Sequence, residues 1–364
     1  MYFDSHPKTD RKDLYDRDPE LKQFLSALSS APVTVVTGLR RTGKTSFVNV
    51  ALKESGFPYA FLDLRELPYN PSQSDVVRRL EAAFRQIDRK WFSDLTGALK
   101  HLRGVSILGN ELSFQWGRAG IDLGELFLEI NKWATDRHME FVIAFDEIQV
   151  IRGDKWMLGF LAHVADTYRN VPIVVTGSEV GVLFDFLGFD NPDSPLFGRH
   201  YVQVQMKDFS ANEAMDFLAE GFRQIKMSAS LDVLNYAVQK LDGVPGWLTM
   251  FGVRCKESNV SSSLIVDEVA SKAKELVRAE VLKMTALSRR YAVVLNFLVK
   301  VNEASWSQTR AVLESKEQKS VTSHVASTVL KNLMKTGIVS VKEGKYRVAD
   351  ALLSEAIKKE PLPE

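Results

Sequence analysis

Cysteine is nearly absent from the sequence, with Cys255 as the single example. One cysteine excludes an internal disulfide and a cysteine-based metal cluster within one chain. Long hydrophobic runs are also missing, because no uninterrupted apolar stretch approaches the roughly 20 residues that a membrane-spanning helix needs. The N-terminal stretch MYFDSHPKTDRKD is polar and unlike a secretion signal. These absences predict a cytoplasmic protein without a membrane partner.

The composition is otherwise typical of a folded globular protein. Of the 364 residues, 45% are hydrophobic and 26% are charged, which is close to globular averages. The length exceeds one typical domain, so we expect two or three packed units.

The net charge of +1 is unevenly distributed along the chain. Between Lys283 and Arg347, 12 lysines and arginines stand against four acids, which gives this segment a balance of +8 and leaves about −7 for the remainder. Such a basic segment faces a polyanion in some proteins and an acidic neighbouring domain in others.

The first half of the chain alternates short apolar runs with helical stretches. Runs this apolar indicate strands that are buried on both faces, as in a parallel sheet covered by helices, so the fold class is α/β. The expected strands are 33–37, 59–64, 141–145, 171–177 and 201–205. The stretch GVSILGNELSFQW at 104–116 departs from this pattern, because alternating apolar residues flank the turn pair Gly109-Asn110; it predicts a β-hairpin insertion.

From Phe209 the sequence becomes helical. Ser210 precedes Glu213 by the spacing of a capping box, and another helix is expected to begin at Pro245. A long charged helix follows at about 266–284. The last part contains three helical patterns and then GIVSVKEGKYRV, in which two alternating strands flank Glu343-Gly344. Three helices followed by a hairpin is the layout of a winged helix.

The segment GLRRTGKT matches the phosphate-binding pattern G-x-x-x-x-G-K-[ST] and lies between an apolar strand and a helix, as that pattern requires. Its glycines let successive backbone N–H groups point at phosphate oxygens. Lys44 is expected to neutralise the β- and γ-phosphates of ATP, and Thr45 to hold Mg²⁺. The expected nucleotide-binding residues of this loop are Gly38, Leu39, Arg40, Arg41, Thr42, Gly43, Lys44, Thr45 and Ser46.

The apolar strand FVIAF ends in two adjacent acids, Asp146 and Glu147. Ligands of open α/β sheets bind at the carboxyl ends of the strands, so Asp146 suits a role as a second Mg²⁺ ligand. Glu147 suits activation of the attacking water, because hydrolysis needs a nearby base or water-orienting group. The simpler alternative for Asp146 is a helix N-cap.

Two further segments carry candidate catalytic residues. The strand VPIVVTG is followed by polar residues, of which Ser178 is the first choice and Thr176 the second for sensing the γ-phosphate; a hydroxyl that caps the next helix is an equal alternative. Arg199 precedes the fifth strand, and its planar fork suits the stabilisation of triphosphate charge in cis or in trans. A structural salt bridge explains Arg199 equally well.

These motifs together resemble the archaeal ATPases of the STAND branch of P-loop NTPases, relatives of AAA+ proteins. The resemblance also includes RKDLYDRDPELKQFL at 11–25, TGSEVGVL, PLFGR and LDGVPGWL at 241–248, and so covers nearly the whole chain. It implies a sheet in the order 5-1-4-3-2, a helical lid and a C-terminal winged helix. It also implies that Tyr15 and Arg17 lie near the adenine and that Pro245 lies beside the nucleotide.

We accordingly expect a P-loop ATPase domain at 1–206 with an insertion at about 71–118, a helical lid with its linker helix at 207–282, and a winged helix at 283–364. The expected function is an ATP-binding and ATP-hydrolysing switch with ATP or ADP and Mg²⁺ as ligands. An ATP-gated DNA-binding protein resembling an archaeal replication initiator is the alternative, and a scaffold that holds nucleotide permanently is a third. The basic winged helix suits a protein partner or DNA, and the chain is expected to be a monomer or a nucleotide-dependent homo-oligomer.

Overall fold

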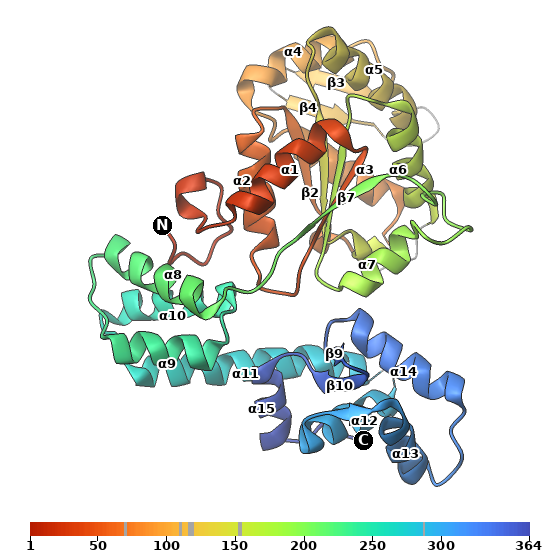
Figure 1. Ribbon diagram of the computed structural model, residues 1–364. Coiled ribbons are helices and arrows are strands. Elements are labelled where there is room, and N and C mark those ends of the chain that lie inside the picture. The colour runs from red at the N-terminus through yellow and green to blue at the C-terminus, as the bar shows by residue number, and fades with distance from the viewer. Residues whose placement is uncertain (69–70, 109–110, 116–119, 152–154, 287) are drawn as a thin grey trace.

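The computed structural model describes residues 1–364 except 69–70, 109–110, 116–119, 152–154 and 287. Figure 1 shows an α/β region, a helical region beside the N-terminus, and a C-terminal region below the α/β region. No helix among the described residues is both long and apolar enough to cross a membrane.

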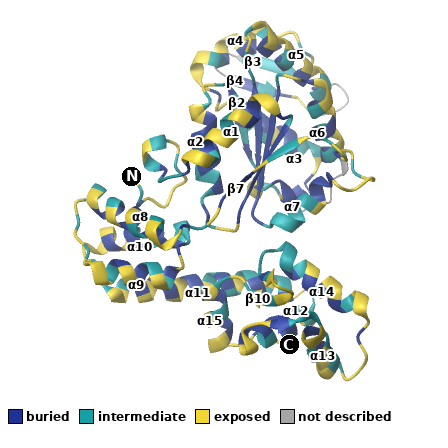
Figure 2. Cartoon of the chain, in the orientation of Figure 1, coloured by how far each residue is buried: buried dark blue, intermediate teal, exposed yellow. Residues whose placement is uncertain are grey.

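The central sheet has five parallel strands in the order β2-β5-β6-β1-β7. When the two strands of the insertion are left out of the numbering, this order is 5-1-4-3-2 read from β7. The central strands are buried along their whole length, as Figure 2 shows, which agrees with their apolar sequences. The strands are β1 (Val33–Thr37), β2 (Tyr59–Asp63), β5 (Val142–Asp146), β6 (Ile173–Gly177) and β7 (Tyr201–Gln205).

Each face of the sheet has its own hydrophobic core, because alternate residues of a strand point to opposite faces. Val36 and Val174 pack with α1 (Asp18–Ser30) and α2 (Lys44–Glu54). Val35 and Val175 belong to the core on the other side. The helices of that side are α3 (Gln73–Phe84), α4 (Arg89–Leu99), α5 (Leu123–Asp136), α6 (Lys155–Thr167) and α7 (Val180–Leu187).

The insertion contains the predicted hairpin, formed by the antiparallel strands β3 (Val105–Leu108) and β4 (Glu111–Phe114). The predicted turn pair, 109–110, and the end of the insertion at 118 lie outside the described residues. Two short 3-10 helices follow strands of the central sheet: η2 (Leu64–Glu66) directly follows β2, and η3 (Ile148–Ile151) closely follows β5. They carry residues of the site described below.

The helical region begins at Ser210, whose capping box with Glu213 is present as predicted. Its last helix, α11, starts three residues earlier than predicted and continues toward the C-terminal region. The helices are α8 (Ala211–Gln224), α9 (Leu231–Leu241), α10 (Pro245–Ser258) and α11 (Ser263–Thr285).

The C-terminal region has the three predicted helices and the predicted hairpin, and adds one short strand and one helix. Its elements are α12 (Arg289–Val301), β8 (Ala304–Ser305), α13 (Trp306–Glu317), α14 (Ser323–Lys335), β9 (Val339–Lys342), β10 (Lys345–Val348) and α15 (Ala351–Lys359). The sheet order is β8-β10-β9. One continuous buried core runs through the helical and C-terminal regions, so α11 joins them mechanically. The domain boundaries inferred from the sequence stay a prediction.

Candidate nucleotide-binding site

The loop between β1 and α2 adopts a backbone that only glycine permits at its two ends. A Cβ atom on Gly38 would lie 2.6 Å from the carbonyl oxygen of Met206, and Gly43 has a φ of 91°. Gly43 directly precedes α2, so the N-terminal N–H groups of this helix open onto the loop. This arrangement forms an anion-binding site, because backbone N–H groups and the positive end of the helix dipole face the same space.

Lys44 lies inside the curl of this loop and is 5% exposed. Its Nζ atom donates hydrogen bonds of 2.9 Å to the carbonyl oxygens of Gly38 and Leu39 and lies 4.0 Å from Oε1 of Glu147. Burial lowers the pKa of Lys44, while the carboxylates of Glu147 and Asp146 oppose this shift. Phosphate oxygens arriving in the loop would therefore find a desolvated cation already in place.

Asp146 is fully buried at the end of β5, where two hydroxyl groups hold its carboxylate. Thr45 Oγ1 donates to Oδ2 at 3.0 Å, and Thr176 Oγ1 donates to Oδ1 at 2.6 Å. Burial raises the pKa of Asp146, and the hydrogen bonds from Thr176 and Thr45 counteract this. A divalent cation would favour the ionised carboxylate. The adjacent oxygens of Thr45 and Asp146 are hard ligands of the kind that Mg²⁺ prefers alongside substrate phosphates, so these residues fit the ion.

Glu147 has a left-handed backbone conformation, with a φ of 55°. Its backbone N–H donates to Thr176 Oγ1 at 2.9 Å, so this one hydroxyl fixes both acids. Ser178 binds the Glu147 Oε2 atom through its backbone N–H at 3.2 Å and through Oγ at 2.9 Å. Gln149 Nε2 donates to the same oxygen. The structure thus brings the predicted Ser178 to Glu147.

The hydroxyl groups of Thr42 and Ser46 have partners within the protein. Thr42 Oγ1 donates to the Leu39 carbonyl at 2.9 Å, which tightens the loop. Ser46 Oγ accepts a hydrogen bond of 3.0 Å from the backbone of Lys8 and so ties α2 to the N-terminal segment.

Tyr15 and Arg17 lie where the N-terminal segment meets the start of the helical region, and Pro245 lies at the start of the helix that contacts the phosphate-binding loop. Tyr15 packs edge-on against Phe209, and the guanidinium of Arg17 lies 4.8 Å from the centre of the same ring. Pro245 begins α10, and the next residue donates its backbone N–H to the Arg41 carbonyl at 2.9 Å. The helical region therefore contacts the phosphate-binding loop directly. The roles of these three residues toward the adenine stay predictions.

Arg199 lies apart from this group of residues. Its guanidinium pairs with both carboxylate oxygens of Asp166 on α6, at 2.8 and 2.5 Å, and also donates to the Pro195 carbonyl. This is the structural salt bridge that the sequence left open. A catalytic role of Arg199 stays a prediction.

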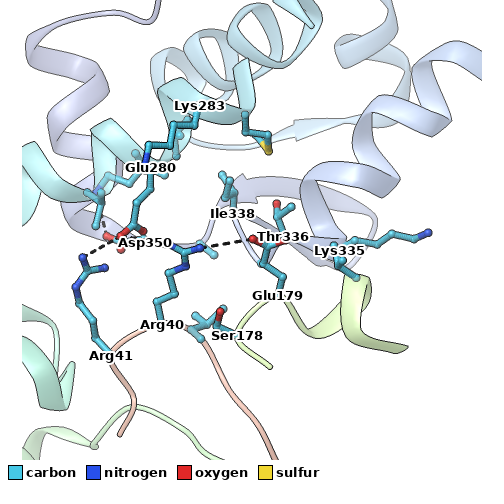
Figure 3. Close-up of a pocket in the computed structure, with 18 of the residues that line it drawn as sticks. Arg40, Arg41, Ser178, Glu179, Glu280, Lys283, Lys335, Thr336, Ile338 and Asp350 are labelled. Atoms are coloured by element: carbon cyan, nitrogen blue, oxygen red, sulfur yellow. Dashed lines mark hydrogen bonds and ion pairs between the residues drawn. The ribbon is translucent and has the colours of Figure 1, made fainter. Parts of the chain in front are cut away.

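The outer side of the loop faces a cavity of about 840 Å³ between the three regions of the chain. As Figure 3 shows, Arg40 and Arg41 extend from the loop toward Glu280 on α11. Arg41 lies 2.9 Å and Arg40 lies 3.3 Å from the Glu280 carboxylate. Arg40 also lies 3.6 Å from Glu179. Two adjacent residues thus connect the phosphate-binding loop to α11, the helix that leads to the C-terminal region.

A family model for ATPase domains found predominantly in Archaea matches residues 14–251. The match covers more than half of the chain, and the chain belongs to this family of ATPases. It is a P-loop enzyme that binds and hydrolyses ATP.

Two solved structures have a similar fold. The Walker-type ATPase paby2304 of Pyrococcus abyssi is similar over 98% of this chain and 100% of that chain, with a TM-score of 0.83 and 29% identity. The Aeropyrum pernix ORC2 protein, solved as ADPNP-ADP complexes, is similar over 98% of this chain and 96% of that chain, with a TM-score of 0.62 and 12% identity. The second likeness is one of fold alone. A comparison with curated proteins gave no match.

Three residues of this site escaped the sequence reasoning: Arg65, Gln149 and Glu280. Gln149 follows Glu147 by two residues, close to the carboxyl end of β5, so its position in the sequence indicates a place at the same edge of the sheet. Arg65 follows β2 by two residues, at the carboxyl edge where ligands bind. Glu280 carries no comparable signal, because it is one of several acids on a charged helix.

Proposed function

We propose that this ATPase is a molecular switch of the STAND type, in which MgATP turnover rearranges a helical lid and a C-terminal winged helix. The observation that carries the proposal is the pairing of Arg40 and Arg41 with Glu280. These arginines belong to the loop that would wrap the phosphates, and Glu280 belongs to the helix that continues toward the winged helix. The site and the C-terminal region therefore share one set of charges.

The proposal assigns a chemical role to each residue of the site, and the contacts described above support these roles. Lys44 and the backbone N–H groups of the loop bind the β- and γ-phosphates. Thr45 and Asp146 would hold Mg²⁺, which would supply positive charge to neutralise the phosphate oxygens. Glu147 accepts the proton of the attacking water. Ser178 orients Glu147 and reports on the γ-phosphate through this contact.

The coupling has an electrostatic basis. Glu280 and Glu179 hold Arg40 and Arg41 on the outer side of the loop, and Arg41 also lies 4.2 Å from the centre of the Trp247 ring on α10. A bound triphosphate brings several negative charges close to both arginines and competes with Glu280 for them. Loss of the γ-phosphate weakens that competition, so the ATP and ADP states hold α11 differently.

The C-terminal region also contacts the α/β region through α14 and α7. Lys335 pairs with Asp185, and a Cβ atom on Gly181 would lie 2.4 Å from the Cα atom of Lys335. This close packing puts the end of α14 against α7 of the α/β region. A nucleotide-dependent release of α14 would be the output of the switch.

Phosphate release and binding of a fluorescent ADP test the proposal together. The wild type should hydrolyse ATP slowly, and Lys44→Ala should bind nucleotide at least about tenfold more weakly, because it loses a buried charge contact. A purified chain that binds no ATP, or a Lys44→Ala variant with wild-type turnover, would refute the site. An ATPase whose C-terminal region responds equally to ATP and ADP would refute the switch.

A second candidate function is ATP-gated binding of DNA, and the exposed hairpin β9–β10 favours it. Lys342 and Arg347 are exposed on this hairpin, where a wing can reach phosphates. Other cations of the region are held by acids, as in the pairs of Lys345 with Glu303 and Arg290 with Glu317, so the balance of +8 overstates the available charge. Binding to random duplex that falls steeply with salt, and falls further in Lys342→Ala, would support DNA as the partner.

The assembly state is part of the same proposal. The chain acts as a monomer or as a nucleotide-dependent homo-oligomer, and Arg199 is the residue that would reach a neighbouring site. Arg199→Ala mixed with Glu147→Gln protein should regain activity only if Arg199 acts in trans. A site that takes Glu147 from the Arg199→Ala chain and Arg199 from the Glu147→Gln chain would then contain both intact residues.

A further inference from the structure

Arg65 lies at the edge of the sheet where the catalytic acids are, although the sequence motifs do not include it. It belongs to η2, directly after β2. Strand β2 pairs with β5 in a register that puts Asp63 beside Asp146. The chain therefore delivers Arg65 to the same edge as the metal-binding carboxylate.

Asp63 is the main hydrogen-bond partner of the Arg65 guanidinium. Its carboxylate accepts hydrogen bonds from the Arg65 backbone N–H at 3.0 Å, from Nε at 2.9 Å and from Nη2 at 2.6 Å. The Nη2 atom also lies 3.4 Å from Oδ2 of Asp146. This is the oxygen that accepts the hydrogen bond of Thr45.

The guanidinium thus lies against the same Asp146 oxygen that Thr45 contacts, and Thr45 and Asp146 are the residues that would hold Mg²⁺. The side chain of Arg65 is 51% exposed, so it has room to move. A divalent ion on the same oxygen would repel it, and the terminal phosphate of ATP would offer a new anionic partner at the same edge. Arginine suits such a partner because its planar fork matches phosphate geometry and stays charged.

We propose that Arg65 is a catalytic arginine acting in cis: it moves from Asp146 to the terminal phosphate when MgATP binds and stabilises the charge of the transferring phosphoryl group. This inference rests on the proposed ATPase site. In the step, the water oxygen bonds to the γ-phosphorus while the bond from that phosphorus to the bridging oxygen breaks. ADP leaves with the bonding electrons, and Glu147 takes the water proton. Arg65 keeps its protons throughout.

The alternative arginine, Arg199, is tied to Asp166 and donates to the Pro195 carbonyl. Arg65 needs only to exchange one carboxylate contact for a phosphate contact while Asp63 keeps its hold. Arginine residues placed on a transferring phosphoryl group contribute factors of about 10³–10⁵ to the rate in related chemistry. We expect a loss at or below the lower end of that range, because Lys44 also neutralises charge.

The test compares Arg65→Ala, Arg65→Lys and a control, Arg78→Ala. Arg78 is an exposed arginine of α3 that pairs with Asp75 on its own helix. Arg65→Ala should lower kcat by about 10²–10³-fold and leave ADP affinity within about threefold. Arg65→Lys should recover only part of the rate, because an ammonium lacks the fork. The control should match the wild type.

Two readouts do not depend on turnover. Aluminium fluoride, which mimics the transferring phosphoryl group, should trap ADP on the wild type and on Arg78→Ala but not on Arg65→Ala. Without nucleotide, Mn²⁺ should bind Arg65→Ala at least about threefold more tightly than the wild type, because the competing cation on Asp146 is gone.

An Arg65→Ala variant with kcat within about threefold of the wild type, or with intact fluoroaluminate trapping, overturns the proposal. Melting temperatures show whether Arg65→Ala has a folding defect. If it has, an Arg65→Lys variant with the kcat of the wild type overturns the proposal instead. Failure of the underlying site is distinguishable, because the wild type would then release no phosphate or Lys44→Ala would release as much.

Discussion

The inner and outer sides of the phosphate-binding loop differ in chemistry. On the inner side, buried Lys44 lies near Glu147, and half-buried Thr45 donates a hydrogen bond to Asp146. On the outer side, Arg40 and Arg41 extend into the cavity between regions and share Glu280. The inner residues are arranged for phosphate chemistry, and the outer residues for communication. One loop of eight residues, Gly38 to Thr45, connects the two.

The inner side should carry most of the catalytic effect. Glu147→Gln keeps the size of the side chain but removes its capacity to accept a proton, so kcat should fall by about 10²–10⁴-fold, as measured by phosphate release under saturating ATP. Glu179→Gln is the matched control. Glu179 follows β6 as Glu147 follows β5, but it pairs with Arg40 on the outer side. Equal losses in the two variants would erase the distinction between the sides.

Thr176 should have a smaller effect on the inner side, because it acts through the two acids. Thr176→Val removes the hydroxyl that donates to Asp146 and accepts from the Glu147 backbone. We expect kcat to fall about tenfold, since each lost hydrogen bond to a charged group costs roughly 1.5–3 kcal/mol at most, together with a higher Mg²⁺ requirement.

A control for this prediction is Thr34→Val on neighbouring β1. Thr34 is fully buried, and its hydroxyl has no hydrogen-bond partner among the described residues. The substitution should leave kcat and the Mg²⁺ titration unchanged. A Thr176→Val enzyme with the wild-type Mg²⁺ requirement would contradict the positioning role.

On the outer side, Glu280→Gln should change nucleotide affinity more than turnover. Removing the Glu280 charge frees Arg40 and Arg41 for the phosphates, so ATP should bind about 3–10-fold more tightly. This change lies at or slightly below the lower end of typical coupling free energies between sites, which are about 1–3 kcal/mol. Equilibrium titration with a fluorescent nucleotide measures this. Glu275→Gln on the same helix, where Glu275 pairs with Lys272 at the surface, should bind like the wild type. Weaker ATP binding in Glu280→Gln would reverse the assignment.

The smallest expected effect concerns the pH dependence of stability in the cavity on the outer side. Burial, together with the nearby carboxylates of Asp242 and Asp350, raises the pKa of Asp208 to about 6, while Arg17 and Lys44 oppose the shift. Because the folded-state pKa lies above the ordinary value near 4, folding favours the protonated form. The contribution of Asp208 to the free energy of unfolding is therefore greatest below pH 4 and is lost as the pH rises through 6.

Asp208→Asn should accordingly be more stable than the wild type at pH 7, by on the order of 1 kcal/mol once partial exposure is allowed for. The difference should shrink as the pH falls and vanish below about pH 4. Denaturant unfolding at several pH values measures it. A difference that is constant across this range would show that Asp208 does not titrate as described.

The inner side of the loop could be predicted from the sequence because its chemistry is local. A glycine-rich turn before Lys44 and two acids after an apolar strand are patterns that the chain carries within short segments. Parallel pairing then brings them to one edge without further information. The hairpin insertion and the capping box of Ser210 were predictable for the same reason.

The outer side could not be predicted, because its contacts join residues far apart in the chain. The pair of Arg41 and Glu280 depends on how α11 crosses the site. Away from the loop, the pair of Arg199 with Asp166 depends in the same way on the packing of α6. Nothing in the sequence indicated that Glu280 or Asp166 would be the partner. Arg65 lies between these cases: its position at the end of β2 was visible, but its contact with Asp146 required the register of β2 and β5.

Hydrogen exchange of the full chain, with and without a non-hydrolysable MgATP analogue, tests the coupling of the two sides most directly. Lys44→Ala serves as the control that lacks the phosphate contact. The account predicts slower exchange in 38–46 together with altered exchange in α11 and at the contact of α14 with α7, and neither change in Lys44→Ala. Exchange that changes only within 38–46 and 146–149 would contradict it.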